Sequence, residues 1–183
     1  MKKKNQIKIA IPFLAVILLL SGCLKDSRYV DYSDVGVLVE LPLAEVNNYQ
    51  EVSGPFETET YSLAKGATDT IIVAVNVASP KPLTTALSVT LTTGDLTALN
   101  AYNTANGTTL TPLPAADFSV IGSLTVTVPP NQRLAYATIV IKAKAMGVAN
   151  SGNYVLPITI SSASGEPIAQ PEKALLYNIV ITP

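Results

Sequence analysis

Thr70–Ala78 reads TIIVAVNVA and Thr84–Thr92 reads TTALSVTLT, two runs separated by the proline-containing segment Ser79–Pro82. Both runs are rich in Val, Ile and Thr, the β-branched residues that favour extended backbone. Short runs of this composition, bounded by Pro and Ser, are typical of β-strands. These two stretches therefore predict a β-rich domain.

The rest of the chain after residue 34 repeats this pattern. Thirteen prolines fall mostly between the apolar runs, as expected for turns and sheet edges. Regularly spaced short strands separated by turn residues predict a β-sandwich of about seven to nine strands. The further predicted strands are Val35–Leu41, Phe56–Leu63, Leu124–Val128, Tyr136–Ile141, Tyr154–Ile160 and Ala174–Ile181.

One segment departs from the strand pattern. Leu96, Leu99 and Tyr102 recur at every third position after Asp95, and Asn106-Gly107 follows. Asp is a favoured residue just before a helix, and Gly is favoured just after one. We therefore expect one short helix, capped by Asp95 and packed over one end of the sandwich.

The amino-terminal residues predict export. Four lysines precede the apolar run Ile9–Leu20, which is shorter than the ~20 residues of a spanning helix and is typical of a secretory signal. Leu20-Ser21-Gly22-Cys23 resembles the lipobox of bacterial lipoproteins. This resemblance implies lipid transfer to the Cys23 thiol, cleavage before Cys23 and acylation of the new amino terminus. An ordinary secretory signal is the alternative, but Cys23 is the chain's single cysteine and stands where a lipobox needs it.

These observations predict three regions: a signal peptide at 1–22, a lipidated cysteine and flexible tether at 23–34, and one β-sandwich domain at 35–183. Lys25-Asp26 resembles a weak form of the export signal of Bacteroidetes lipoproteins that reach the outer face of the outer membrane, and an ordinary solvated linker is the alternative. We expect the chain to be anchored to the outer membrane by lipid and to face the exterior.

The charge after cleavage bears on partners. The chain from Cys23 onward has 8 basic and 13 acidic residues, a formal charge of −5. An acidic domain without a basic run is not expected to bind nucleic acid. With Cys23 lipidated, no disulfide can form, so stability must come from core packing.

Two motifs occur in order along the chain: Leu99–Asn103 with Asn106–Thr108, Leu113-Pro114 and Phe118, and the later Tyr154–Ile160 (YVLPITI). Together they resemble the domain-of-unknown-function 1735 family of Bacteroidetes lipoproteins. The resemblance implies an immunoglobulin-like β-sandwich at the cell surface, often encoded beside glycan-harvesting machinery. Longer members carry a carboxy-terminal lectin-like, discoidin-like or glycosidase module, whereas this sequence ends after its last predicted strand, so their effector activities are not expected here. We expect the motif residues to have mainly structural roles, and Pro157 within a strand favours an edge or a bulge.

The residues for catalysis are largely missing from the sequence. It contains no histidine, no Gly-x-Ser-x-Gly motif and no phosphate-binding glycine loop, and its single thiol is the predicted lipidation site. Glu57 and Glu59 share one face of a predicted strand, where a solvated surface is the favoured interpretation over a pair of catalytic carboxylates. We therefore expect no enzyme activity, no catalytic residue, no cofactor and no metal site.

A binding role remains. Sugars stack on aromatic rings, and the sequence has no tryptophan but eight tyrosines. Of these, Tyr102, Tyr136, Tyr154 and Tyr177 fall within predicted elements and are expected in the core or on strand surfaces. A glycan contact by the tether or loop residues Tyr29, Tyr32 and Tyr49 is a weaker hypothesis.

The tripeptide Asp69-Thr70-Ile71 resembles the O-glycosylation acceptor of exported Bacteroidetes proteins, which makes Thr70 a candidate modified residue. The sequence predicts a non-catalytic surface lipoprotein that acts as an accessory binding module in glycan capture. The alternative is a structural or adhesive scaffold that contacts a surface protein partner through an exposed sheet edge.

Overall fold

Two β-sheets account for most of the fold. The computed structural model describes residues 36–44, 56–62, 64, 66 and 68–183, which belong to one compact unit, Val35–Pro183. The predicted all-β sandwich is confirmed, with ten strands among the described residues. Their bounds are β1 Leu38–Glu40, β2 Phe56–Ser62, β3 Asp69–Ala78, β4 Leu87–Thr92, β5 Thr111–Pro112, β6 Phe118–Ile121, β7 Thr125–Val128, β8 Leu134–Ile141, β9 Tyr154–Ser162 and β10 Ala174–Thr182.

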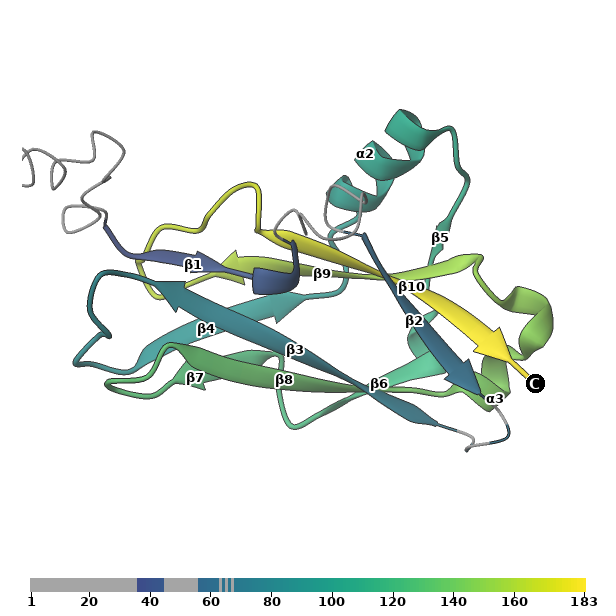
Figure 1. Ribbon diagram of the computed structural model, residues 1–183, viewed down its shortest axis with the longest axis horizontal. Coiled ribbons are helices and arrows are strands. Elements are labelled where there is room, and N and C mark those ends of the chain that lie inside the picture. Colours follow the sequence, from purple (N-terminus) through teal and green to yellow (C-terminus); the bar gives the residue numbers. More distant parts are fainter. Residues whose placement is uncertain (1–35, 45–55, 63, 65, 67) are drawn as a thin grey trace, which may run out of the picture. The chain divides into compact units, whose positions relative to one another are not determined.

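The chain alternates between the two sheets (Figure 1). The four-stranded sheet has the order β1-β3-β8-β6, and the second sheet has the order β2-β10-β9-β4-β7 with β5 beside β9. Among the described strands, β9 and β10 are the only consecutive pair that hydrogen-bond to each other. Strands β2 and β10 pair in parallel although well over a hundred residues separate them in the sequence. The sandwich is therefore held together mainly by long-range pairing.

The core fills the space between the sheets, and β3 shows how the sequence creates it. Side chains alternate between the two faces of a strand. Ile71, Val73, Val75 and Val77 are at most 3% exposed, while the residues between them point outward. Burying an aliphatic side chain of this kind contributes roughly 1.5–3 kcal/mol. The apparently continuous apolar run of β3 thus has one buried face and one outward face.

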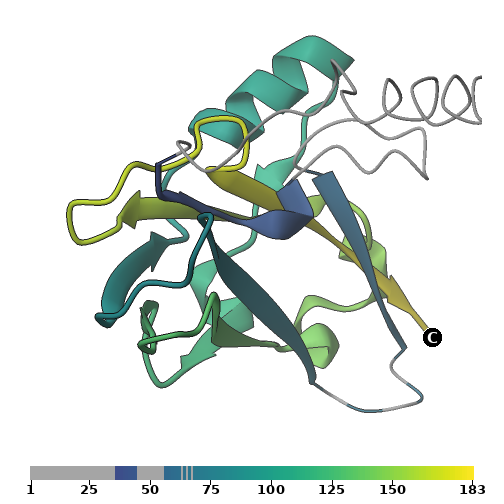
Figure 2. The same ribbon diagram turned by 60° about the vertical axis from the view of Figure 1, so that its left-hand side comes forward.

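The predicted helix is confirmed as α2, Thr97–Asn106, but its position differs from the prediction. Leu99 is 1% exposed and packs with Val155 of β9 and Leu176 of β10 in a small second core. Figure 2 shows α2 on the side of β9 and β10 that faces away from β3. The helix thus covers the outer face of the larger sheet instead of one end of the sandwich.

Both ends of α2 have the residues predicted for them, but Asp95 lies one position earlier than predicted. The helix begins at Thr97, so Leu96 occupies the capping position and Asp95 precedes it. The Thr97 amide still donates a 3.0 Å hydrogen bond to Asp95 Oδ1. Hydrogen bonding by the Thr97 side chain, followed by that of its amide, lowers the pKa of Asp95. At the other end Gly107 has a φ of 63°, a left-handed conformation that glycine adopts without strain.

Two further strands and several short helices were not predicted. The added strands are β5 and β6. Strand β5 could not be predicted because it has only two residues, one of them proline. The short helices are α3 (Ala143–Met146), η2 (Pro42–Ala44), η3 (Ala115–Asp117) and η4 (Val148–Asn150).

The position of Pro157 has a specific explanation. Strand β9 is not an edge strand, since it lies between β10 and β4. On the side away from β10, however, β9 pairs with β5 at Tyr154 and Val155 and with β4 only from Thr159 onward. Pro157 lies between these two partners, where β9 needs no backbone donor on that side.

Candidate binding surface

The predicted lipidation site lies outside the described residues. This applies to Leu20, Ser21, Gly22 and Cys23, and the assignments made for them stay predictions. Tyr29, Tyr32 and Tyr49 also lie outside the described residues. In the part of the chain that is described, no helix is both long and apolar enough to cross a membrane.

Asn103, from the first family motif, organises the turn after α2. Its Nδ2 donates a 2.8 Å hydrogen bond to the Leu110 carbonyl. Its Oδ1 accepts hydrogen bonds from the Thr108 hydroxyl at 2.7 Å and from the Leu110 amide at 3.1 Å. A single side chain therefore satisfies three polar groups of the chain that returns from α2 toward β5. The motif has the structural role that was expected of it.

Tyr102, the preceding residue, fastens α2 to the edge of the larger sheet. Its ring stacks on Phe56 of β2 with a centroid distance of 4.3 Å and an interplanar angle of 8°. Both side chains are half-buried and pack against the Leu99 cluster. The Tyr102 ring is occupied by this contact and is not a free platform for a ligand.

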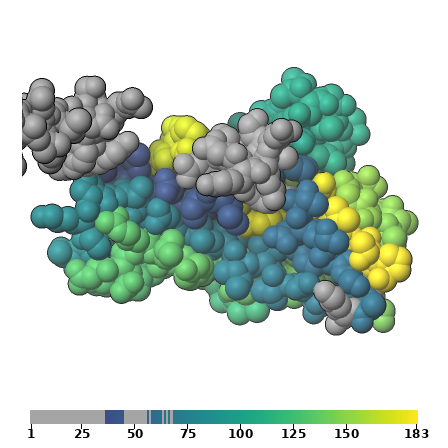
Figure 3. Space-filling view, viewed as in Figure 1, coloured from purple at the N-terminus to yellow at the C-terminus, as the bar shows by residue number. Residues whose placement is uncertain are grey.

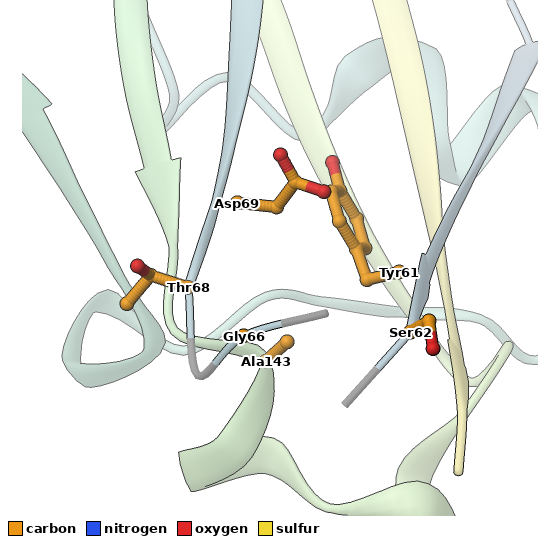
Figure 4. Close-up of a pocket in the computed structure, with 6 residues that line it drawn as sticks. All are labelled: Tyr61, Ser62, Gly66, Thr68, Asp69 and Ala143. Atoms are coloured by element: carbon orange, nitrogen blue, oxygen red, sulfur yellow. The ribbon is translucent and has the colours of Figure 1, made fainter. Parts of the chain in front are cut away.

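A small pocket lies where the chain passes from β2 to β3. Its volume is about 190 Å³, and it is lined by Tyr61, Ser62, Gly66, Thr68, Asp69 and Ala143. Figure 4 shows the Tyr61 hydroxyl and the Asp69 carboxylate on the two strands, turned to the same side of the pocket. Tyr61 is 3% exposed, and its hydroxyl has no hydrogen-bond partner among the described residues.

The electrostatics of this pocket oppose acid–base chemistry. Burial, followed by the negative charges of Glu59 and Asp69, raises the pKa of Tyr61 far above its usual value, so the phenol stays neutral. No group of three or more His, Cys, Asp or Glu that could hold a metal ion occurs among the described residues. The pocket thus offers the neutral Tyr61 hydroxyl beside the side chain of Asp69, its one acidic lining residue among those described.

The interpretation of the Glu57–Glu59 face needs a correction. The parallel register pairs Glu59 with Ile179, a core residue of β10, and Tyr61 with Ile181. Glu59 therefore lies on the core side of edge strand β2, where it is half-buried and raises the pKa of Tyr61. The expected solvated face is wrong for Glu59, because the strand faces of β2 are set by its pairing with β10.

Thr70 lies at the start of β3 on the outward side. It is exposed, and its amide donates a 2.7 Å hydrogen bond to Oδ1 of Asp69. The neighbouring residues Asp69 and Ile71 belong to the opposite face of β3, and Ile71 is buried. The Thr70 side chain is therefore accessible at the surface of the four-stranded sheet, and its modification stays a prediction.

The same surface contains four of the most exposed large apolar side chains. Ile72 is 60%, Ile121 59%, Tyr136 56% and Leu134 43% exposed. Apolar groups gathered on one exposed face indicate an interaction surface, whereas scattered ones do not. We call this surface the outward face, and it consists of Thr70, Ile72, Ala74 and Asn76 of β3, Leu134, Tyr136, Thr138 and Val140 of β8, and Ser119 and Ile121 of β6.

Strand register brings these residues together. Thr138 pairs with Ile72 on one side and with Ile121 on the other, so the three form a row across the sheet. The next row pairs Tyr136 with Ala74, and the small alanine leaves the ring open beside it. In the space-filling view the surface of β3 adjoins the green segment that holds β7 and β8 (Figure 3).

The tyrosines within predicted elements divide into different roles. Tyr177 is in the core at 1% exposure, and Tyr154 is half-buried against it. Among Tyr102, Tyr136, Tyr154 and Tyr177, only Tyr136 presents an exposed ring. The sequence alone does not distinguish Tyr136 from the other three, because the exposure of its ring depends on which face of β8 points inward.

Solved structures show the same fold at low sequence identity. A multidomain protein from Bacteroides ovatus that includes domain-of-unknown-function 1735 superposes with a TM-score of 0.59 at 14% identity over 80% of this chain and 45% of its own. A candidate carbohydrate binding protein from the same species gives 0.55 at 13% identity over 76% and 36%. Bacteroides thetaiotamicron EndoBT-3987, solved with a Man5GlcNAc product, gives 0.51 at 22% identity over 68% and 28%.

This chain spans less than half the length of each of these three proteins. No curated protein matches it in sequence. A family model that describes an N-terminal domain matches residues 36–167, which is more than half of the chain. The chain therefore belongs to this family of N-terminal domains. It shares its fold with a protein that includes domain-of-unknown-function 1735, the family that its sequence motifs resemble.

Proposed function

We propose that this protein is a lipid-anchored lipoprotein of the outer membrane that faces the exterior, and that its β-sandwich is a non-catalytic accessory binding module in glycan capture. The lipobox residues Leu20–Cys23 support the anchor, with a signal peptide at 1–22 and a tether at 23–34. A non-catalytic role is supported by a sequence without histidine whose single cysteine is the predicted lipid attachment site. Its membrane partner is then the lipid bilayer, and its second partner a polysaccharide.

The observation that carries the glycan-binding proposal is the exposed ring of Tyr136 on the flat outward face. A sugar ring has an apolar face of C–H groups, and its burial against an aromatic ring removes apolar surface from water. Two of the similar structures, described as a candidate carbohydrate binding protein and as EndoBT-3987 with a bound oligosaccharide product, make a glycan the ligand class to test first.

The test is a binding screen with the mature chain from residue 23, carrying Cys23→Ser so that it stays soluble. Native gels that contain plant or host polysaccharides should retard the protein, and calorimetry should confirm each hit. Bovine serum albumin in the same gels controls for sieving by the polysaccharide. Failure to bind any member of a broad panel would refute a role in glycan capture.

The second candidate function is a scaffold that contacts another surface protein. It is favoured by β6, the four-residue edge strand of the four-stranded sheet, whose Ile121 is 59% exposed. An exposed edge with an apolar side chain can pair with a strand from a partner. Cross-linking on whole cells through a photoreactive residue at position 121 should then trap one defined protein, and a cell lacking such an adduct would rule this candidate out.

We also propose O-glycosylation of Thr70, which is exposed beside Asp69 in the acceptor-like tripeptide. The mature protein isolated from its natural host should carry extra mass on the peptide that contains Thr70, and Thr70→Ala should lose this mass. A Thr70 peptide of unmodified mass would contradict the proposal.

A further inference from the structure

We infer that the outward face binds an uncharged, extended polysaccharide along β8, with Tyr136 as the stacking ring and with acidic polysaccharides excluded. This inference rests on the proposed role in glycan capture and adds the site and the ligand class. Three properties of the outward face support it: its shape, its charge and its mixture of hydroxyl and apolar groups.

The shape suits an extended chain. The four outward residues of β8, from Leu134 to Val140, span about 20 Å at roughly 3.4 Å per residue. Strands β3 and β6 border this line on both sides, so the surface is three strands wide at Thr138. The described pocket near Tyr61 is on the other side of β3 and is too small for more than a single sugar ring. An extended polymer is therefore the ligand that uses the whole surface.

The charge of the surface excludes acidic ligands. In the described strands β3, β8 and β6, no outward position carries a charged side chain. The carboxylate at its border, Glu40 of β1, accepts a 2.7 Å hydrogen bond from Asn76. Because the predicted mature chain has a formal charge of −5, uronate or sulfate groups would be repelled without a compensating cation.

The two cations next to the ends of β8 are already engaged. Arg133 donates to the carbonyl oxygens of Val77, Ser79 and Pro80, which ties the turn after β3 to the start of β8. Lys142 donates a 2.9 Å hydrogen bond from Nζ to the Ala116 carbonyl. Neither side chain is positioned to pair with an anionic sugar on the outward face.

The mixture of hydroxyl and apolar groups on the outward face favours a sugar ligand over an apolar protein surface. Hydroxyl groups of Thr138 and Tyr136 lie beside the aliphatic side chains of Ile72 and Ile121. A pyranose likewise combines an apolar face with hydroxyl groups at its rim, so both kinds of group on the protein find a partner. In a buried protein–protein interface, each of these hydroxyls would need a hydrogen-bond partner from the other protein. Without such a partner, its removal from water would be unfavourable.

The experiment compares two sets of polysaccharides with matched protein variants. The probes are galactomannan, xyloglucan and yeast mannan as uncharged polymers, and polygalacturonate and chondroitin sulfate as acidic ones. The mature Cys23→Ser chain is tested beside Tyr136→Ala, Tyr136→Phe and the control Val148→Ala, which removes an exposed apolar group (42%) outside the outward face. Circular dichroism verifies that each variant is folded, and Ile121→Ser on the edge strand provides a second, independent change to the outward face.

We expect at least one uncharged polymer to bind and neither acidic polymer to do so. Tyr136→Ala should weaken binding about tenfold, which corresponds to ~1.4 kcal/mol. Tyr136→Phe keeps the ring and should stay within about threefold of wild type, or ~0.7 kcal/mol, and Val148→Ala should bind as wild type does.

The outcomes that overturn the inference are distinct from failure of the proposed function. Binding of acidic polymers in preference, or unchanged binding by both Tyr136→Ala and Ile121→Ser, would overturn the site and ligand class while glycan capture stands. A chain that is dimeric in solution and becomes monomeric with Tyr136→Ala would show that a second copy occupies the outward face. No binding to any polysaccharide would refute the proposed function itself.

Discussion

Replacing Asn103 by alanine tests the structural interpretation of the family motif. The change removes three hydrogen bonds, two with the backbone of Leu110 and one with the Thr108 hydroxyl. Each such bond contributes about 0.5–1.5 kcal/mol net, and the half-buried Leu110 groups lose their partners, so we expect a loss of about 2–3 kcal/mol in the free energy of unfolding. For a domain of this size the melting temperature should fall by about 5–10 °C.

The matched control is Asn100→Ala in the same helix, where the wild-type side chain is exposed. Alanine has the higher helix propensity, so this variant should be as stable as wild type or slightly more stable. Urea unfolding and thermal unfolding, both followed by far-UV circular dichroism, measure the two variants, since the sequence has no tryptophan for fluorescence. An Asn103→Ala protein that melts within 1 °C of wild type would refute the idea that this side chain holds the turn.

Three further predictions test individual contacts. Tyr61→Phe removes a buried hydroxyl that has no hydrogen-bond partner among the described residues, so stability should be unchanged or rise by up to ~1 kcal/mol in urea unfolding, and a clear loss would contradict this. A double-mutant cycle of Phe56→Ala and Tyr102→Ala should give a coupling of about 0.5–1.5 kcal/mol, whereas strict additivity would mean that the stack is unimportant. The pKa of Asp95 is lowered in the folded state, so its contribution is present above the unfolded carboxyl pKa of about 3.9 and is lost as the pH falls through the lower folded pKa. Asp95→Asn should therefore be less stable than wild type at pH 7 and as stable as wild type near pH 2. A stability difference that persists at pH 2 would show that the Asp95 charge is not its cause.

Local sequence patterns were sufficient to predict eight of the ten described strands. The alternation in β3 and the apolar runs of β9 and β10 are visible without any knowledge of their neighbours, because side-chain period and β-branching are local properties. The same holds for α2, whose Gly107 stop was predicted correctly. Strand β6 (FSVI) was missed because its two last residues are both apolar, whereas the equally short β7 (TVTV) alternates throughout.

The pairing of strands could not be predicted locally, and the candidate surface depends on it. Ile72 looks like a core residue within TIIVAVNVA, and only the pairing of β3 with β8 assigns it to the outward side. Likewise Glu59 lies on the core side because β2 pairs with β10 from the far end of the chain. Tyr136 was predicted to lie in a strand, but its exposure follows from the same long-range register.

The central claim is that the outward face is the binding surface. The most direct measurement is an amide chemical-shift map of the ¹⁵N-labelled mature chain during titration with an uncharged oligosaccharide from the best-binding polysaccharide. The account predicts that the largest shifts cluster at Ile72, Tyr136, Thr138 and Ile121, with little change in α2. Shifts confined to α2 or to the Tyr61 pocket, or no shifts at saturating ligand, would contradict it.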